Sequence, residues 1–215
     1  MSELLVGGFE PLSVCDWPGQ LAATVFCQGC PWRCGYCHNP HLLPVRRAAL
    51  LSWPATLDFL RRRRGLLDAV VFSGGEPTLQ KGLVEAVVQV RALGFRIGLH
   101  TGGAYPSRLA QVLPLVDWVG FDVKTAFDDY DDLTRARGSG RRARASLRLL
   151  LDSGKPHDLR TTIHPRLHPA SRLDRLREDL EQEGAGPSRL QAFRSTGCLD
   201  SGLHVTDEEM EWGPA

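Results

Sequence analysis

The sequence contains no run of apolar residues long enough to cross a bilayer as a helix, which takes about 20 residues. Its N-terminal segment, MSELLVGGFE, has neither the basic start nor the apolar core of roughly 7–15 residues that a secretory signal peptide needs. These two absences predict a cytoplasmic protein with no membrane partner. In that compartment cysteines stay reduced, so a disulfide framework is not expected.

An excess of charge of one sign is also missing, because 26 Lys and Arg against 25 Asp and Glu leave a net charge of +1. Two arginine runs, RRRR at 61–64 and RARGSGRRARASLR at 135–148, are not interleaved with aromatic residues. We interpret both as solvated faces and expect no nucleic-acid partner. No internal repeat or long linker divides the 215 residues, of which 42% are hydrophobic, so the sequence predicts a single domain over 1–215.

Cysteine, in contrast, is concentrated: four of the six cysteines lie in the segment FCQGCPWRCGYCHNP, residues 26–40. Clustered cysteines in a reducing compartment indicate metal binding or redox chemistry. A zinc ribbon needs two C-x2-C pairs separated by about 15–20 residues, and a bacterial ferredoxin has the gaps C-x2-C-x2-C-x3-C-P. The gaps C-x2-C-x3-C-x2-C found here match neither.

The spacing from Cys30 through Cys34 to Cys37, with Tyr36 before the last cysteine, resembles that of radical S-adenosylmethionine enzymes. The longer stretch CPWRCGYCHNP is similar to the activating proteins of anaerobic ribonucleoside-triphosphate reductase. Further similar segments follow in order: DWPGQLAATVF (16–26), RRGLLDAVVFSGGEPTLQKGL (63–83), GFRIGLHTGG (94–103), VDWVGFDVK (116–124), LRTTIHP (159–165) and LQAF (190–193). The resemblance implies that Cys30, Cys34 and Cys37 hold a [4Fe–4S] cluster whose fourth iron chelates S-adenosylmethionine.

The remaining cysteines are predicted not to bind the cluster. Cys27 ends the β-like run LAATVFCQ, where alternation places it on the same face as Ala23 and Val25. A fourth thiolate would also occupy the iron that S-adenosylmethionine needs. Cys15 and Cys198 lie far away in the sequence, and we interpret them as free thiols.

The coarse pattern alternates strands with helices. Strands are predicted at 21–28, 69–73, 95–100, 118–122, 159–163 and 189–193, with helices at 81–93 and 171–183. Such alternation favours parallel pairing, and six units fit this length where eight would need about 250 residues. The predicted fold is therefore α/β, an open six-stranded parallel (β/α)6 partial TIM barrel, as the resemblance also implies, with the cluster loop at 27–40.

Candidate cofactor-binding residues follow the ends of these strands. In SGGEP, Gly74 and Gly75 allow close backbone approach, and Glu76, fixed by Pro77, can accept from an ammonium group. By resemblance that group is the amino group of S-adenosylmethionine; the alternative is a simple turn.

The other candidates are Thr101, Asp122, Lys124 and Arg160. Asp122 and Lys124 resemble a D-x-K pair near the cofactor's amino-acid end, and Arg160 matches an arginine that approaches the cofactor. Taken alone, the pair could be a surface ion pair and the arginine could face solvent.

Three observations limit the assignment. The family's D-T-N-G is replaced by HTGG at 100–103, which puts a monovalent cation site in doubt. The stretch His38-Asn39-Pro40 is interpreted as the exit of the loop. No role is assigned to His164, His168 or His204.

The function implied by the resemblance begins with an external one-electron donor, such as flavodoxin or ferredoxin, that reduces the cluster. S-adenosylmethionine is then cleaved, and the resulting 5′-deoxyadenosyl radical takes a hydrogen atom from a glycine of the anaerobic reductase. No side chain is predicted to act as a general acid or base. The alternatives are another glycyl-radical protein or a small molecule as the target, or an iron–sulfur or zinc regulator without turnover.

Overall fold

A computed structural model describes residues 3–45, 49–198 and 200–206. The predicted single domain over 1–215 thus extends beyond the described residues at both ends and at 46–48 and 199. No helix in the described ranges is long and apolar enough to cross a membrane.

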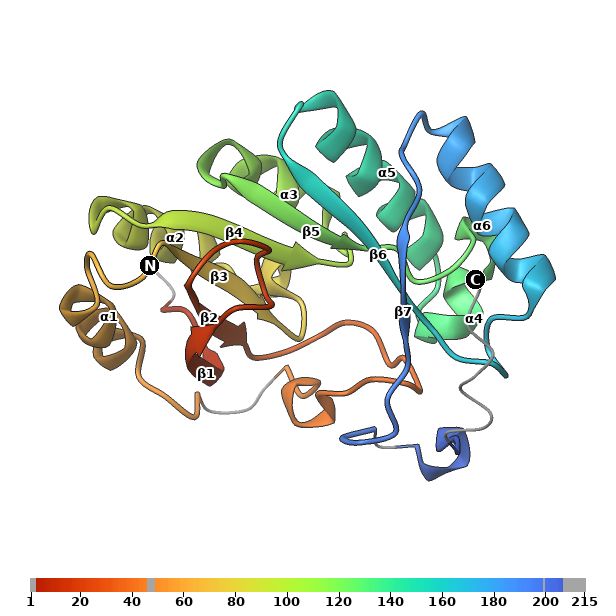
Figure 1. Cartoon of the computed structure of the whole chain (residues 1–215), viewed down its shortest axis with the longest axis horizontal. Helices are drawn as coiled ribbons and strands as arrows, with labels where there is room; N and C mark the ends of the chain where they lie inside the picture. Colours follow the sequence, from red (N-terminus) through yellow and green to blue (C-terminus); the bar gives the residue numbers. More distant parts are fainter. Residues whose placement is uncertain (1–2, 46–48, 199, 207–215) are drawn as a thin grey trace.

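The centre of the fold is one curved sheet of seven strands (Figure 1). Along the sheet they follow the chain order: β1 (Val6–Ser13), β2 (Ala22–Cys27), β3 (Ala69–Gly74), β4 (Arg96–Thr101), β5 (Trp118–Asp122), β6 (His157–Ile163) and β7 (Arg189–Ala192). Strands β2 to β7 pair in parallel. Within the described residues β1 and β7 pair with no strand on their outer sides, so the barrel is open.

The prediction of a six-stranded sheet was wrong by one strand. All six predicted strands exist and form the parallel part, but β1 pairs antiparallel to β2 at the edge of the sheet. Its sequence, VGGFEPLS, contains two glycines and a proline, which are unfavourable in most strands. An edge strand tolerates proline because one side of its backbone has no partner, and two register shifts accommodate the irregular sequence.

The helices cover the convex side of the sheet (Figure 1). They are α1 (Trp53–Arg62), α2 (Leu83–Ala92), α3 (Pro106–Val112), α4 (Tyr130–Thr134), α5 (Ser139–Asp152) and α6 (Ala170–Gln182). Short 3-10 turns lie at Pro40–Leu42, Pro77–Leu79, Leu113–Leu115, Phe127–Asp129 and Ser201–Leu203. The two predicted helices correspond to α2 and α6, whose buried leucines and valines recur at helical spacing.

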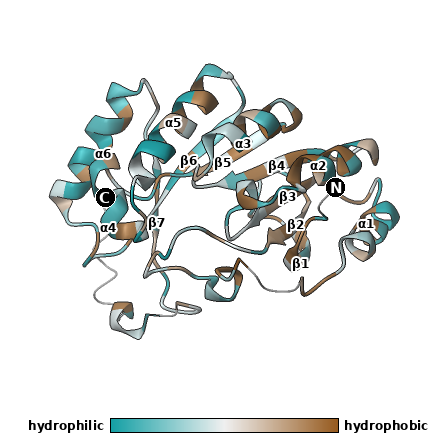
Figure 2. Ribbon diagram, turned by 180° about the vertical axis from the view of Figure 1, so that it is seen from behind, coloured by the Kyte–Doolittle hydropathy of each residue, from teal (hydrophilic) through white to brown (hydrophobic). Residues whose placement is uncertain are grey.

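Side-chain alternation separates the two faces of the sheet. Ala23, Val25 and Cys27 of β2 belong to the main core between the sheet and the helices, where the hydropathy colouring is brown over the central strands (Figure 2). On the concave face, Trp17 stacks on Trp118 with ring centroids 5.4 Å apart. This second apolar cluster fills the concave face below the carboxyl ends of the strands, which leaves polar side chains to gather at those ends.

Candidate functional site

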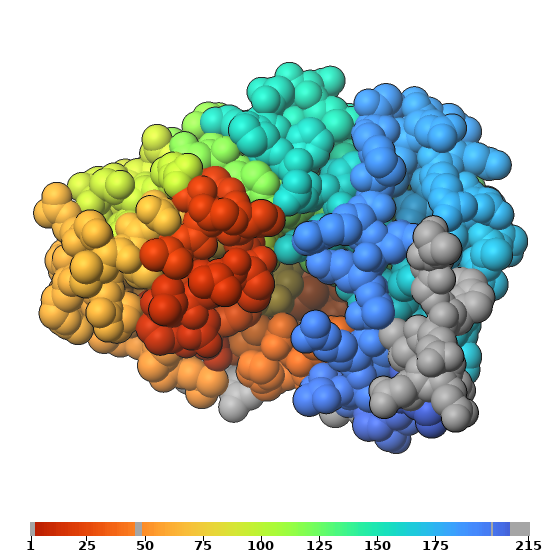
Figure 3. Space-filling view, viewed as in Figure 1, coloured from red at the N-terminus to blue at the C-terminus, as the bar shows by residue number. Residues whose placement is uncertain are grey.

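A cavity of about 390 Å³ opens at the carboxyl ends of the parallel strands. In the space-filling view it lies in the hollow between the red N-terminal part and the blue C-terminal part (Figure 3). All of the predicted site residues line this cavity except Pro77, which is buried at the start of a 3-10 turn. The chain thus brings together residues from the cluster loop and from the ends of four strands.

The four cysteines of this segment lie in different surroundings, and Cys27 lies where the alternation of β2 predicts. Cys30, Cys34 and Cys37 line the cavity. Cys27, with 0% of its surface exposed, lies instead in the main core beside Ala23 and Val25. The loop is held partly by Arg33, whose Nη1 donates to the carbonyls of Cys30 and Trp32 at 2.8 Å each.

The backbone of SGGEP packs directly against the start of the cluster loop. Gly74 has a φ of 116°, and a Cβ at Gly75 would lie 2.3 Å from the carbonyl oxygen of Gly29. The amide of Glu76 donates to that same carbonyl at 2.9 Å. Only glycine allows this contact, so the two glycines join the end of β3 to the cluster loop.

The Glu76 carboxylate is buried, and its oxygens accept four hydrogen bonds. Oε1 accepts from the amide and hydroxyl of Thr78 at 3.1 and 2.6 Å and from the Thr101 hydroxyl at 2.7 Å. Oε2 accepts from the amide of Gly102 at 3.0 Å, and Glu76 lines the cavity. Burial raises the pKa of Glu76, while the Thr78 and Thr101 donors favour its charged form.

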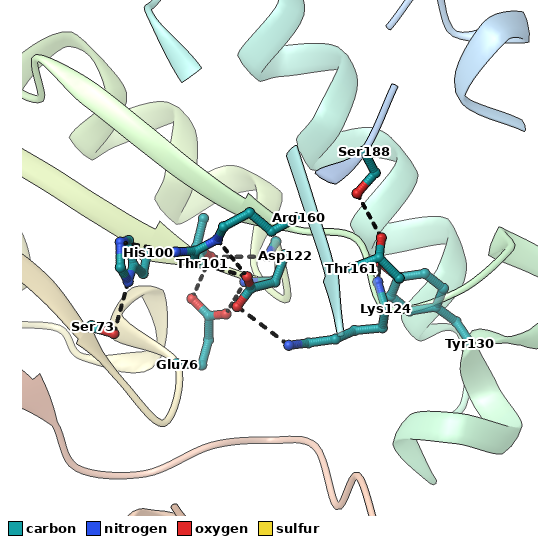
Figure 4. Close-up of polar contacts among 12 residues, drawn as sticks. Ser73, Glu76, His100, Thr101, Asp122, Lys124, Tyr130, Arg160, Thr161 and Ser188 are labelled. Atoms are coloured by element: carbon teal, nitrogen blue, oxygen red, sulfur yellow. Dashed lines mark hydrogen bonds and ion pairs between the residues drawn. The ribbon is translucent and has the colours of Figure 1, made fainter. Parts of the chain in front are cut away.

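A second group of charged side chains links the end of β5 to β6 (Figure 4). Arg160 donates to Asp122 Oδ1 from Nη2 at 2.9 Å and from Nε at 3.2 Å, and Lys124 Nζ lies 3.4 Å from Asp122 Oδ2. Although burial opposes ionisation, Lys124 and Arg160 hold the pKa of Asp122 well below its usual range. Within this group, which is separate from the Glu76 carboxylate and its own contacts, one carboxylate faces two cations. The group therefore carries one excess positive charge, which suits an anionic group of a ligand.

Comparison with known proteins identifies the family. Residues 24–177 match the family model of the Radical SAM superfamily, where SAM stands for S-adenosylmethionine. The chain belongs to this superfamily.

Two similar proteins carry names that concern glycyl-radical activation. A Methanocaldococcus jannaschii protein named for glycyl-radical-enzyme activation is 33% identical over 172 residues, covering 76% of this chain and 70% of its own. The pyruvate formate-lyase-activating enzyme of Clostridium pasteurianum is 32% identical over 143 residues, covering 64% of this chain but only 58% of its own.

Solved radical SAM structures share the fold. Streptococcus suis SuiB bound to S-adenosylmethionine has a TM-score of 0.61 at 14% identity, covering 78% of this chain and 39% of SuiB. The AdoMet-bound anSMEcpe structure also has a TM-score of 0.61, at 15% identity, covering 80% and 49%. The chain therefore spans less than half of either protein.

Radical SAM proteins use a [4Fe–4S] cluster and S-adenosylmethionine, and the donor set of this cavity fits both. Three thiols suit an iron–sulfur cluster. Burial raises the pKa of Cys30 to about 12 and that of Cys34 to about 11, so these thiols release their protons only when a metal group binds them. No group of three His, Cys, Asp or Glu side chains in the described ranges is placed to hold a single metal ion. Cys30, Cys34 and Cys37 would hold the cluster.

Two buried polar atoms in the cavity wall form no hydrogen bond with any described residue. They are Trp32 Nε1 and Tyr36 Oη, and both side chains are nearly fully buried. Both residues line the cavity. A buried donor without a partner is costly, so these atoms are suited to a polar ligand such as S-adenosylmethionine.

His100 also lines the cavity, although the sequence predicted no role for it beyond replacing the aspartate of D-T-N-G. Its Nδ1 lies 3.3 Å from the Ser73 hydroxyl and its Nε2 lies 2.6 Å from the Asp16 carbonyl oxygen and 3.4 Å from Arg160 (Figure 4). Burial, with the Arg160 charge, lowers the pKa of His100 to about 4. A neutral imidazole beside a guanidinium gives little attraction to a monovalent cation.

Other missed cavity residues include Asp16, Phe26, Trp32, Ser73, Thr162 and Gln191. Several of them are the concave-facing residue near the end of a strand. Because side chains alternate along a strand, the neighbours of residues that face the helices must face the concave side. This rule could have predicted Phe26, Ser73 and Thr162 from the sequence. Trp32 and Asp16 lie in loops and carry no such signal.

The histidines without an assigned role are structural. His168 lies 2.9 Å from the carbonyl oxygen of Lys124, and His164 lies 2.7 Å from that of Leu203. His204 Nε2 is 3.5 Å from the Cys198 carbonyl oxygen. They hold the turn after Lys124 and the C-terminal segment in place.

The C-terminal segment, residues 193–198 and 200–206, packs on the outer side of the cluster loop. His38 stacks on Phe193, and its Nε2 lies 2.7 Å from the carbonyl oxygen of Arg194. Cys198 Sγ lies 3.4 Å from the carbonyl oxygen of Gly35. His38 therefore anchors the loop exit, and the Cys198 thiol donates to a backbone carbonyl of the loop.

Proposed function

We propose that this radical SAM protein activates an anaerobic ribonucleoside-triphosphate reductase by forming a glycyl radical on it. The main support is the single cavity that Cys30, Cys34 and Cys37 share with the Asp122–Lys124–Arg160 group. The stretch CPWRCGYCHNP and the names of the similar proteins support the glycyl-radical target.

Each group of residues has a distinct part in this proposal. Cys30, Cys34 and Cys37 would hold the cluster, and Glu76, with Gly74 and Gly75, would position the amino end of S-adenosylmethionine. Lys124 and Arg160, which share the single carboxylate of Asp122, suit the carboxylate of S-adenosylmethionine.

When bound and reduced, the cluster and S-adenosylmethionine supply a 5′-deoxyadenosyl radical that removes a hydrogen atom from the substrate. The protein binds, orients and shields the reactants from water. Tyr36 and Trp32 contribute buried polar atoms to this environment. The proposed reaction requires no general acid or base.

The open barrel suits a protein substrate. Because β1 and β7 are separate edges of the described sheet, the cavity is reachable from the side, where a loop of a folded partner could enter. A radical at a glycine Cα needs its backbone in the cavity, and a loop offers that more readily than a strand or helix.

The test uses protein reconstituted with iron and sulfide without oxygen. Dithionite and S-adenosylmethionine are added, 5′-deoxyadenosine is measured, and the reductase is then supplied while electron spin resonance is recorded. A glycyl doublet on the reductase is expected. No 5′-deoxyadenosine from fully loaded protein would favour a regulator without turnover.

A second candidate target is a pyruvate formate-lyase, because the C. pasteurianum relative is named for activating one. The same assay with this lyase in place of the reductase separates the two. 5′-Deoxyadenosine with no doublet on either protein would point to another glycyl-radical protein or a small molecule.

A further inference from the structure

The arginine run at 135–148 contains six arginines, of which Arg142 donates from Nη2 to the carbonyl of Arg137 at 3.1 Å. The other five divide into two groups. Arg144 and Arg148, on α5, both bind the carboxylate of Glu183, with an Nε to Oε1 distance of 2.6 Å for Arg144. Arg135, Arg137 and Arg141 are exposed and form no ion pair with any residue in the described ranges. Only the first group is explained by contacts within the chain.

Two acidic residues precede these arginines in the chain, Asp131 and the exposed Asp132, and Asp131 has a structural part in the turn that follows. The Asp131 carboxylate accepts from the amides of Gly138 and Ser139 at 2.6 and 2.8 Å and from the Ser139 hydroxyl at 2.9 Å. It is thus used to fix the turn that presents the arginines. We call Arg135, Arg137 and Arg141 together the basic surface.

The basic surface lies next to the cluster loop. The amide of Arg33 donates to the carbonyl of Thr134, the last residue of α4, at 2.8 Å. Arg135, the next residue, has a φ of 53°, and its Nη2 is 3.8 Å from the position of a Cβ at Gly35. In Figure 1 the orange cluster loop extends toward α4, whereas α1 is at the opposite end of the molecule.

A second cavity, of about 310 Å³, opens on this side of the loop. Arg33 and Arg135 line it together with Cys34, Gly35 and Cys37. Cys34 and Cys37 also line the first cavity. Asp200 of the C-terminal segment also lines this second cavity, so the segment covers part of that side of the loop. Two of the three predicted cluster ligands line both cavities.

These two sides suit two different partners. If the first cavity holds S-adenosylmethionine and the glycine of the substrate protein, a reductant protein cannot use the same opening. The second cavity offers a separate approach to the same loop. Because electron transfer weakens steeply with distance, a carrier that binds there would be close enough to reduce the cluster.

We propose that Arg135, Arg137 and Arg141 dock an acidic one-electron carrier protein against the outer side of the cluster loop. The inference rests on the proposed radical SAM function, which requires a reduced cluster. One electron leaves the carrier, which is oxidised, and enters the cluster, which is reduced; no bond is formed or broken. Charge complementarity is the recognition chemistry.

The test compares two variants that each remove three positive charges. The first combines Arg135→Asn, Arg137→Gln and Arg141→Gln, with asparagine chosen because it tolerates the left-handed φ. The control combines Arg62→Gln, Arg63→Gln and Arg64→Gln in the other arginine run, at the end of α1, where all three residues are exposed. Iron content and circular dichroism verify that both are folded and loaded.

Binding of oxidised flavodoxin, and of an acidic ferredoxin, to the reconstituted protein is measured by calorimetry. For the first variant we expect Kd to rise at least about tenfold at about 50 mM salt, and the difference to shrink to about threefold or less at about 500 mM. The control should bind as the wild type does. The rate of 5′-deoxyadenosine formation should fall with reduced carrier but stay unchanged with dithionite.

Several results would overturn the inference. These are wild-type affinity in the first variant, an equal loss in the control, or no binding of either carrier to the wild type. Loss of reductase activation by the first variant with dithionite as the reductant would show that the surface binds the substrate protein instead. If the wild type made no 5′-deoxyadenosine with dithionite, the proposed function would fail, while the binding comparison would still judge the docking surface.

Discussion

Replacing Glu76 by glutamine tests the centre of the cofactor site. If the amide oxygen takes the position of Oε1, it keeps the three donors from Thr78 and Thr101. The new NH2 group then faces the amide of Gly102, which loses its acceptor. A hydrogen bond to a charged group contributes about 1.5–3 kcal/mol, and a buried donor without a partner costs about 1–3 kcal/mol. Because the variant no longer buries a charge, we expect a net loss of about 2–4 kcal/mol.

The loss can be measured by urea unfolding without oxygen, followed by circular dichroism. With a slope of about 2 kcal/mol per molar urea, the midpoint should fall by about 1–2 M. Affinity for S-adenosylmethionine, titrated through the cluster spectrum, should fall by about 5–30-fold, since a charge-assisted contact becomes neutral and loses about 1–2 kcal/mol. Cluster content should be retained.

The matched control is Thr78→Val, which removes one donor to Glu76 but keeps its charge. Thr78 does not line the cavity, so stability should fall by about 1 kcal/mol while the affinity for S-adenosylmethionine stays unchanged. A Glu76→Gln variant with the wild-type midpoint and affinity would refute the reasoning. Equal loss of affinity in both variants would show that the position of the loop matters, rather than the charge.

Three further predictions concern other parts of the site. Cys27→Ala should keep iron, sulfide and 5′-deoxyadenosine formation at a stability cost of about 1–2 kcal/mol, whereas Cys30→Ala should lose turnover and much of its cluster; the reverse result would contradict the ligand assignment. Because the pKa of His100 is lowered to about 4 from 6.5, the unfolded chain binds the extra proton first, so stability should fall as the pH drops from about 6.5 to about 4, and urea unfolding of His100→Gln should show a shallower fall. Gly75→Ala should fail to load iron or should unfold at lower urea, because its Cβ would meet the carbonyl of Gly29 at 2.3 Å; wild-type iron content and midpoint would show that the loop can move aside.

The sequence predicted the position of a candidate site residue where that residue stands at the end of a recognisable β-rich run. The parallel strands are short β-rich runs, and Glu76, Thr101 and Asp122 follow or end such runs, so their convergence at one edge could be predicted. The strand β1 was missed because its glycines and proline contradict local propensity, and pairing with β2 overrides that propensity.

Contacts between distant residues could not be predicted in the same way. His100 bonds to Asp16, 84 residues earlier, and no spacing rule connects the two. The four hydrogen bonds to Glu76 come from the segments after two different strands, and they make its substitution costly for stability as well as for binding.

The packing of the C-terminal segment on the cluster loop has a consequence for maturation in the cell. His38 contacts a residue 156 positions later, and Gly35 contacts one 163 positions later. The outer wall of the loop therefore does not exist until the chain has been synthesised past residue 198. Since a group that binds only the completed loop stabilises it by mass action, iron supply and docking of this segment reinforce each other. Loss of iron would therefore weaken the docking of this segment on the loop.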